Sequence, residues 1–171
     1  HYSSRRQRQM CIRDRYLRKQ VQSGADVIQI FDSWANLLTK EDLIEFSFNY
    51  INSLISALKL DPVTKNIPVI IFARNPKCNI EELINTSADC ISLFWSMNDL
   101  NFEVAKNKVA IQGNLDPKIL LESDETIKRE TYKILERFKE YPGYIFNLGH
   151  GITPDISPDK IKYLTNIVRE Y

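Results

Sequence analysis

The sequence has 171 residues, of which 43% are hydrophobic and 26% are charged, a composition typical of an ordinary globular domain. Its formal net charge of +1 gives none of the strong electrostatic attraction that binds nucleic acid or an anionic membrane. No apolar run approaches the roughly 20 residues that a membrane-spanning helix needs, so we expect no membrane span.

The basic residues are concentrated at the N-terminus. Residues 1–15, HYSSRRQRQMCIRDR, hold five Arg and one Asp, whereas the rest of the chain is mildly acidic. The chain begins with His instead of Met, and this segment lacks the apolar core of a signal peptide. We expect residues 1–15 to be a non-native tip that resembles translated adapter sequence, and residues 16–171 to belong to a single domain. The alternative is a basic arm that binds nucleic acid.

The three cysteines are Cys11, Cys78 and Cys90, and they form neither a C-x-x-C pair nor an even-numbered disulfide framework. Such unpaired cysteines are typical of proteins that the cytoplasm keeps reduced. Their spacing indicates no metal site. We therefore expect a soluble, cytoplasmic protein that is not exported.

Five short runs rich in Val, Ile and Phe recur along the chain, and each ends in polar residues or Gly. Several are apolar almost throughout, as strands of a parallel sheet are when helices cover its faces. The pattern predicts strands over residues 27–33, 68–74, 90–95, 109–115 and 144–151.

Helical patterns separate these runs. Residues 39–60 begin with Thr39 and Asp42, three apart as in a capping box, and then repeat apolar residues at helical spacing. A second amphipathic helix follows Ser123, and the last one follows Ser157, with Pro at its first position. The alternation of strand and helix predicts an α/β fold with a parallel sheet.

Glycine usage favours a barrel over an open sheet that binds a nucleotide. Such a sheet has a Gly-rich turn between a strand and a helix, but the chain holds only five Gly and contains neither G-x-G-x-x-G nor G-x-x-x-x-G-K-[ST]. Five strands cannot close a barrel, so about three preceding βα units would lie outside this sequence. The predicted fold class is the C-terminal part, about five βα units, of a (β/α)8 TIM barrel.

Function in a barrel lies at the carboxyl ends of the strands. His150 lies between two Gly at the end of the last predicted strand, where an imidazole can bond a carboxylate or a pyrrole, or merely a loop carbonyl. Ser33 is a hydroxyl donor or a turn former, and Arg74 is a carboxylate ligand or a partner in a rim ion pair. For residues 114–117 the favoured interpretation is structural, with Asp116 capping a helix. No set of residues indicates nucleophilic catalysis.

Three stretches together resemble the uroporphyrinogen decarboxylase family. The resemblance runs from about Tyr16 to Tyr171, and its most specific part is the pair Q-G-N-L-D-P and N-L-G-H-G. It implies the C-terminal half of a (β/α)8 barrel that is usually a homodimer. The stretches are GADVIQIFDSWANLL (24–38), VAIQGNLDPKILL (109–121) and YIFNLGHGITPDISPDKIKYLTNIV (144–168).

The resemblance implies a decarboxylase whose substrate is a tetrapyrrole. In the family, the four acetate arms of uroporphyrinogen become methyl groups as coproporphyrinogen forms, without a metal or any other cofactor. Ser33 and His150 match family positions that contact the substrate, so both are predicted substrate-binding residues. The Arg and Asp groups that bind and activate the ring belong to the N-terminal half, so the isolated chain is predicted to be inactive.

Two stretches depart from the family pattern. Asn75, Pro76 and Lys77 replace a Gly-containing loop after the second strand, and Phe94 stands where an Asp usually precedes Trp95. We expect Phe94→Asp to keep or raise turnover in a completed barrel.

Two other functions stay open at this point. A corrinoid or coenzyme methyltransferase of the same barrel superfamily would need thiol and imidazole ligands for zinc, but Cys78 and Cys90 have no His near them in the sequence. A non-catalytic half-barrel would need another chain to cover its strand edges and its apolar face.

Overall fold

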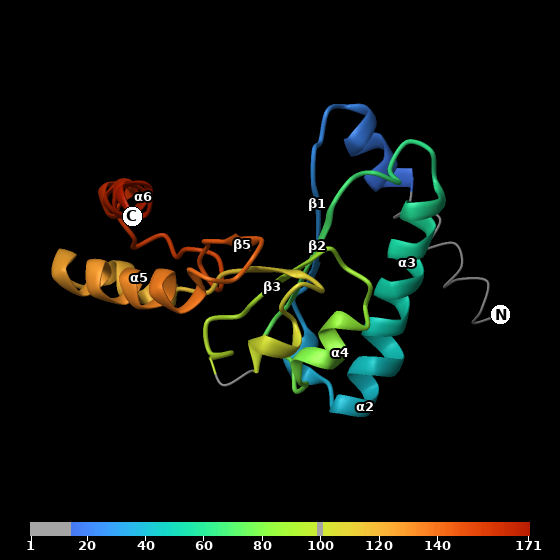
Figure 1. Ribbon diagram of the computed structural model, residues 1–171, viewed down its shortest axis with the longest axis horizontal. Coiled ribbons are helices and arrows are strands. Elements are labelled where there is room, and N and C mark those ends of the chain that lie inside the picture. Colours follow the sequence, from blue (N-terminus) through green and yellow to red (C-terminus); the bar gives the residue numbers. More distant parts are fainter. Residues whose placement is uncertain (1–14, 99–100) are drawn as a thin grey trace.

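The computed structural model describes residues 15–98 and 101–171. Most of the segment predicted to be non-native, residues 1–14, lies outside this described part. Strands and helices alternate along the described chain, as predicted (Figure 1). The strands are β1 (Ile28–Asp32), β2 (Val69–Ala73), β3 (Cys90–Ser92), β4 (Ala110–Gln112) and β5 (Tyr144–Ile145).

The helices include α-helical, 3-10 and π segments. Residues 15–22 are also helical, and none of the described helices is both long and apolar enough to span a membrane. The α-helices are α2 (Lys40–Leu43), α3 (Asn49–Leu60), α4 (Ile80–Ile84), α5 (Asp124–Phe138) and α6 (Pro158–Glu170). The π-helix is η2 (Ile44–Phe48), and the 3-10 helices are η1 (Ala35–Leu37), η3 (Phe102–Val104) and η4 (Pro117–Leu121).

All five strands are parallel and lie in the order β1-β2-β3-β4-β5. Strands that pair in the order of the sequence are characteristic of a barrel, whereas the strand order of a doubly wound sheet reverses at a switch point. β5 is much shorter than the predicted strand 144–151. Beyond it the pairing continues irregularly, through a bridge between Leu115 and Leu148 and a 2.8 Å hydrogen bond from Gly149 N to Leu115 O.

The cross-strand register divides the sheet into two faces, because side chains in register point the same way and alternate along each strand. One row consists of Ile30, Ile71, Ile91, Ile111 and Tyr144. The next row, which we call the inner row, consists of Phe31, Phe72, Ser92, Gln112 and Ile145.

The first of these rows faces the helices. The Tyr144 ring stacks on Phe138 of α5, with 4.6 Å between the ring centroids. Asp32, two residues after Ile30, accepts a hydrogen bond from Ser47 of η2. The inner row therefore points away from the helices, into the interior of the barrel.

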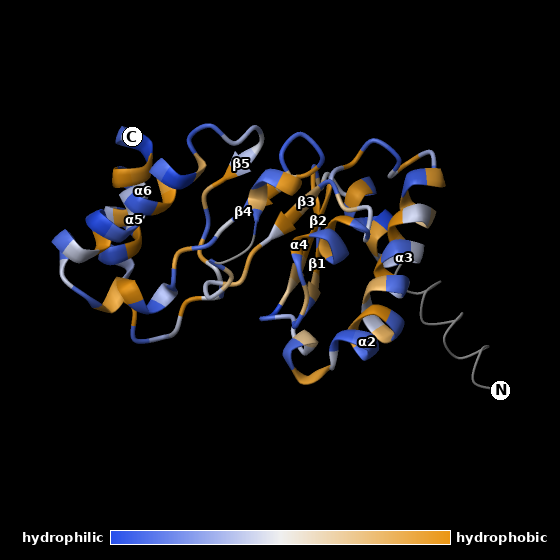
Figure 2. Ribbon diagram, turned by 60° about the horizontal axis from the view of Figure 1, so that its bottom comes forward, coloured by the Kyte–Doolittle hydropathy of each residue, from blue (hydrophilic) through white to orange (hydrophobic). Residues whose placement is uncertain are grey.

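The core lies between the strands and the helices. Ile71, Ile91 and Ile111 are fully buried, and α3 contributes Leu54, Ile55 and Leu58 to the same cluster. Burying a side chain of this size contributes about 1.5–3 kcal/mol. Figure 2 shows that the central strands are mostly apolar. α5 and α6 pack on each other at the opposite end from α3, around Leu115, Leu120, Ile127, Leu164 and Ile167 (Figure 1).

The helix predicted over residues 39–60 is helical throughout, with an irregular centre. The Thr39 hydroxyl accepts a 3.2 Å hydrogen bond from Asp42 N, so the predicted N-cap is confirmed. Between α2 and α3 the chain forms the π-helix η2, a rare conformation that is frequent near functional sites. η2 brings Ser47 to the end of β1.

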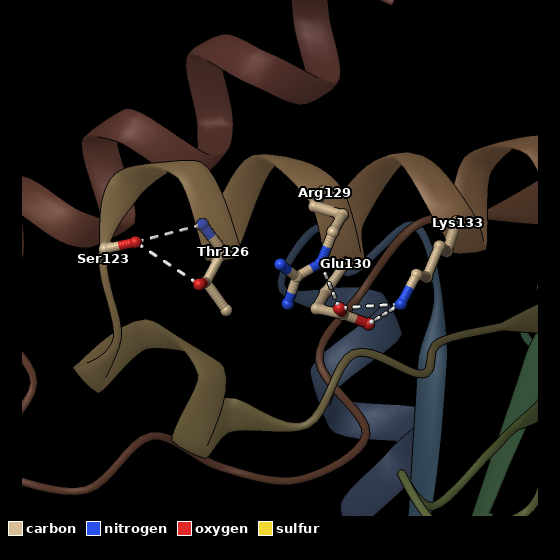
Figure 3. A network of polar contacts seen from close by, with 5 residues as sticks. All are labelled: Ser123, Thr126, Arg129, Glu130 and Lys133. Carbon is tan, nitrogen blue, oxygen red and sulfur yellow. Dashed lines mark hydrogen bonds and ion pairs between the residues drawn. The ribbon is translucent and has the colours of Figure 1, made fainter.

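The predicted caps of α5 and α6 are also confirmed. The Ser123 hydroxyl accepts a hydrogen bond from Thr126 N at 3.3 Å (Figure 3). On the surface of α5, Glu130 pairs with Arg129 and Lys133, and their hydrogen bonds lower the pKa of its carboxyl group. Such exposed ion pairs stabilise a helix only slightly.

The buried Tyr141 makes the free energy of unfolding depend on pH in the alkaline range. Its hydroxyl donates a 2.9 Å hydrogen bond to Val109 O, and burial raises the pKa of the phenol from 10.0 to about 12. Below pH 10 both the folded and the unfolded states keep the proton. Between pH 10 and 12 the unfolded state loses it first, so the free energy of unfolding falls as the pH rises.

We therefore predict that Tyr141→Phe is less stable than the parent chain at pH 9, because it lacks the hydrogen bond. Between pH 9 and 11 its free energy of unfolding should fall by less than that of the parent chain. Urea unfolding at the two pH values measures both effects. An equal loss in the two proteins would contradict the assignment to Tyr141.

Candidate functional site

Ser33 lies in the turn that follows β1, with its side chain exposed. Asp32 holds this turn from two sides. Its Oδ1 accepts a 3.2 Å hydrogen bond from Trp34 N, and its Oδ2 accepts a 2.5 Å hydrogen bond from the Ser47 hydroxyl of η2. The backbone around Ser33 is thus fixed to the helix layer, and Ser33 is one of the residues that line a hollow of about 770 Å³.

This hollow lies at the edge strand β1 and has both polar and apolar residues in its lining. Phe31 is 63% exposed and Trp34 is 70% exposed, and Tyr16 and Phe46 line the same hollow. Exposed aromatic rings at the edge of a sheet are typical of a contact surface. It is where further strands of a barrel would continue the sheet.

His150 lies on the inner side of the sheet. The T-shaped contact of its imidazole with Phe94 has 5.9 Å between ring centroids, and the distance to Phe72 of β2 is 6.3 Å. β5 and β2 are three strands apart, which is roughly 14 Å along a sheet. The loop after β5 therefore folds back across the inner face to bring His150 to β2.

Four rings form what we call the aromatic shelf: Phe31, Phe72, Phe94 and Trp95. Their successive ring centroids lie 5.8, 6.5 and 5.3 Å apart. Ser33 follows Phe31 at one end of the shelf, and His150 rests on Phe72 and Phe94. The shelf thus connects the two predicted substrate-binding residues. The neighbouring ring planes are tilted by 56°, 50° and 41°, and Phe72 and Phe94 are buried, so the shelf is open to solvent mainly at Phe31. An apolar surface with a hydroxyl and an imidazole near it suits an apolar ligand that carries polar arms.

The inner row also holds a buried polar pair. Gln112 Nε2 donates a 3.0 Å hydrogen bond to the Ser92 hydroxyl, and both side chains are buried. This pair and the shelf were missed from the sequence alone, because they depend on the register between strands. The only signal in the sequence was that side chains at alternate positions of neighbouring apolar runs face the same side of a sheet.

The other strand ends have structural roles or remain at the surface. Asp116 caps η4 by accepting a 3.0 Å hydrogen bond from Lys118 N, which confirms the predicted cap, although the helix is 3-10 and not α. The Arg74 side chain is exposed, and its backbone N donates to Asp32 O at 2.9 Å. No rim acid forms an ion pair with Arg74 in the described part of the chain. Its role as a ligand for a substrate carboxylate stays a prediction.

Residues 8–171 match the family model described as uroporphyrinogen decarboxylase (URO-D). The chain belongs to the uroporphyrinogen decarboxylase family. The match begins inside the segment predicted to be non-native, and the origin of residues 1–15 stays a prediction.

Curated relatives agree with this assignment. The chain is 40% identical over 158 residues to the uroporphyrinogen decarboxylase of Vesicomyosocius okutanii subsp. Calyptogena okutanii. It is 41% identical over 164 residues to that of Chlorobaculum parvum. Each match covers 91% of this chain and 45% of the relative, so the chain spans about half the length of these relatives.

A solved structure of a methyltransferase from Methanosarcina mazei has the same fold. The TM-score is 0.65 at 21% identity, and the match covers 88% of this chain and 43% of that chain. At this identity the likeness shows the fold alone. The predicted fold class, part of a (β/α)8 barrel, is confirmed.

The loop that departs from the family pattern keeps the geometry that a glycine would favour. Asn75 has a φ of 41°, a conformation that Gly adopts readily and Asn tolerates. Its Oδ1 accepts a 3.0 Å hydrogen bond from the Ser96 hydroxyl. Asn75 thus supplies both the turn and a link to the loop that carries Trp95.

Cys90 is a buried thiol, and Cys78 is a half-buried one. Burial raises the pKa of each thiol to about 12, so both are protonated at neutral pH. Among the described residues no group of three or more His, Cys, Asp or Glu side chains lies close enough to hold a metal ion.

The expectation that Phe94→Asp keeps or raises turnover in a completed barrel stays a prediction, but the contacts of Phe94 indicate a cost in stability. Phe94 is 7% exposed and contacts the rings of Phe72, Trp95 and His150. We predict that Phe94→Asp lowers the free energy of unfolding by about 3 kcal/mol, because it removes a buried ring and buries a carboxyl group. Phe46→Asp, at an exposed ring, should cost less than about 1 kcal/mol. Equal losses by urea unfolding would contradict this account.

The two glycines that flank His150 differ in the space around them. A Cβ on Gly149 would lie 2.3 Å from Trp95 N, whereas a Cβ on Gly151 would meet nothing within 4 Å. We predict that Gly149→Ala lowers the free energy of unfolding by about 2 kcal/mol or more, and that Gly151→Ala changes it by less than about 0.5 kcal/mol. Urea unfolding of the two variants measures the difference. Equal effects would show that the loop does not rest on Trp95.

Proposed function

We propose that this chain supplies the C-terminal part of a uroporphyrinogen decarboxylase. The substrate is uroporphyrinogen III, and the product is coproporphyrinogen III, formed by cofactor-free loss of CO2 from four acetate arms. The observation that supports this most directly is the aromatic shelf on the inner face of a family member, with Ser33 at one end and His150 resting on it.

The chemistry needs a temporary place for an electron pair. When the C–C bond to a carboxylate breaks, CO2 leaves and the bonding pair moves into the pyrrole, which has first been protonated. A second proton then reaches the exocyclic carbon to make a methyl group, and the ring gives up its extra proton. The net change is the replacement of CO2 by one proton, and no oxidant or reductant is consumed.

In this proposal the chain binds and orients the substrate. The pyrroles lie against the aromatic shelf, the Ser33 hydroxyl donates a hydrogen bond to a carboxylate arm, and the His150 imidazole bonds an arm or a ring N–H. The Arg and Asp groups that hold the remaining arms and stabilise the cationic ring come from the other part of the barrel. The chain alone is therefore inactive.

We further propose that the other part of the barrel covers the hollow at β1. Phe31, Trp34 and Phe46 are exposed there, and adding strands at this edge would bury them. The completed barrel acts as a homodimer in the cytoplasm and binds neither nucleic acid nor a membrane, in keeping with the small net charge.

The test uses a completed barrel, in which the chain is joined to the part of the Chlorobaculum parvum relative that it does not match. We expect this protein to convert uroporphyrinogen III into coproporphyrinogen III, and the chain alone to form none. Ser33→Ala and His150→Ala should each raise KM about tenfold, the effect of losing one hydrogen bond to a charged group.

Ser53→Ala is the matched control, because Ser53 lies on α3 and, among the described residues, its hydroxyl donates to Asn49 O of the same helix. It should leave KM unchanged. Product formation by the isolated chain, or unchanged KM in both site variants, would contradict the proposal.

A further inference from the structure

Asn114, in the Q-G-N-L-D-P motif, is more than the end of a strand. Its side chain is 2% exposed, and its NH2 group reaches three acceptors. Nδ2 lies 3.2 Å from Phe94 O, 3.4 Å from Trp95 O and 3.2 Å from Asn98 Oδ1. Its Oδ1 is buried with no partner in the described part of the chain, so the NH2 group alone holds the side chain.

Asn114 holds the backbone of residues 94 and 95, and the position of His150 is set by contacts with these two residues. Phe94 provides one of the two rings that contact the imidazole. Trp95 provides the backbone against which Gly149 packs, so closely that no side chain fits at position 149. A shift of residues 94 and 95 would therefore move both the support under the imidazole and the residue before it.

The residue after Asn114 holds the same loop from the other side. Leu115 N donates to Asn147 O at 3.2 Å, and Leu115 O accepts from Gly149 N at 2.8 Å. Asn114 thus sits between the loop that carries His150 and the segment on which that loop rests. Asn98 extends this anchor to α5, because Arg137 Nη1 donates to Asn98 Oδ1 at 3.2 Å.

We propose that Asn114 is a positioning residue that holds the His150 imidazole on Phe94 and Phe72, in the place where it meets the substrate. The part about the substrate rests on the proposed function, whereas the part about the imidazole rests on geometry alone. The role requires a donor at this position. An Asp would direct a carboxylate oxygen at two carbonyl oxygens and an amide oxygen, and would repel all three.

The test compares Asn114→Asp with Asn52→Asp in the completed barrel. Asn52 is a matched control, because its Nδ2 also donates to a backbone carbonyl, Asn85 O at 2.8 Å, but on α3. Histidine labelled with 13C at the ring reports the imidazole position, since the rings of Phe94 and Phe72 shift its resonances. The spectrum of His150→Ala assigns the signal.

We expect Asn114→Asp to move the His150 resonances toward the values of a histidine without neighbouring aromatic rings, and Asn52→Asp to leave them in place. Asn114→Ser, which keeps one donor, should give an intermediate shift if Asn114→Asp does not fold. If the His150 resonances do not move in a folded Asn114→Asp or Asn114→Ser variant, the proposal is wrong. This holds whether or not the barrel turns over uroporphyrinogen.

Kinetics supply the second readout. Asn114→Asp should raise KM about tenfold when His150 is present but less than twofold in a His150→Ala background, because a positioning residue has nothing left to position. The same tenfold effect in both backgrounds would show a role independent of His150. If the completed barrel without any substitution does not convert uroporphyrinogen, the proposed function is refuted. The resonance test still decides whether Asn114 positions the imidazole.

Discussion

The arrangement of the site depends on one close backbone contact, that of Gly149 against Trp95. It allows the loop after β5 to turn back over the inner face instead of continuing outward as a strand. The Cβ that every other residue carries would overlap Trp95 N at 2.3 Å, so the contact requires glycine. As a consequence His150 reaches rings on β2 and on the segment after β3, although it follows the last strand of the sheet.

One face of the sheet contributes to the core, and the other carries the proposed binding residues. The row that contains Ile71, Ile91 and Ile111 packs under the helices and supplies the core. The inner row supplies two rings of the aromatic shelf, Phe31 and Phe72, and the buried Ser92–Gln112 hydrogen bond. It is exposed at Phe31, where β1 forms the edge of the sheet. This division explains why a chain that spans about half of its relatives presents a built part of a site next to a large apolar edge.

Much of the fold could be predicted from the sequence because apolar runs and helix caps are local signals. Thr39, Ser123 and Ser157 cap helices where the pattern indicated, and five runs form five parallel strands. The end of the last strand was placed too late. Phe146 and Leu148 are apolar because they pack against the cluster around α5 and α6, which a strand pattern cannot distinguish from pairing.

The site could be predicted only in part. Ser33 and His150 were predicted from their positions at strand ends and from a family motif, and their role in binding stays a prediction. Phe72, Phe94 and Asn114 act through contacts between segments far apart in the chain. The π-helix that brings Ser47 to Asp32 leaves no periodic signal either. The capping box of α4, formed by Asn79 and Glu82, was readable but lies in a helix too short to stand out.

The most direct measurement is a crystal structure of the completed barrel with coproporphyrinogen III bound. Our account predicts that a pyrrole lies against the exposed end of the aromatic shelf at Phe31, with the His150 imidazole and the Ser33 hydroxyl within hydrogen-bond distance of the ligand. A tetrapyrrole bound away from Ser33 and His150 would contradict it.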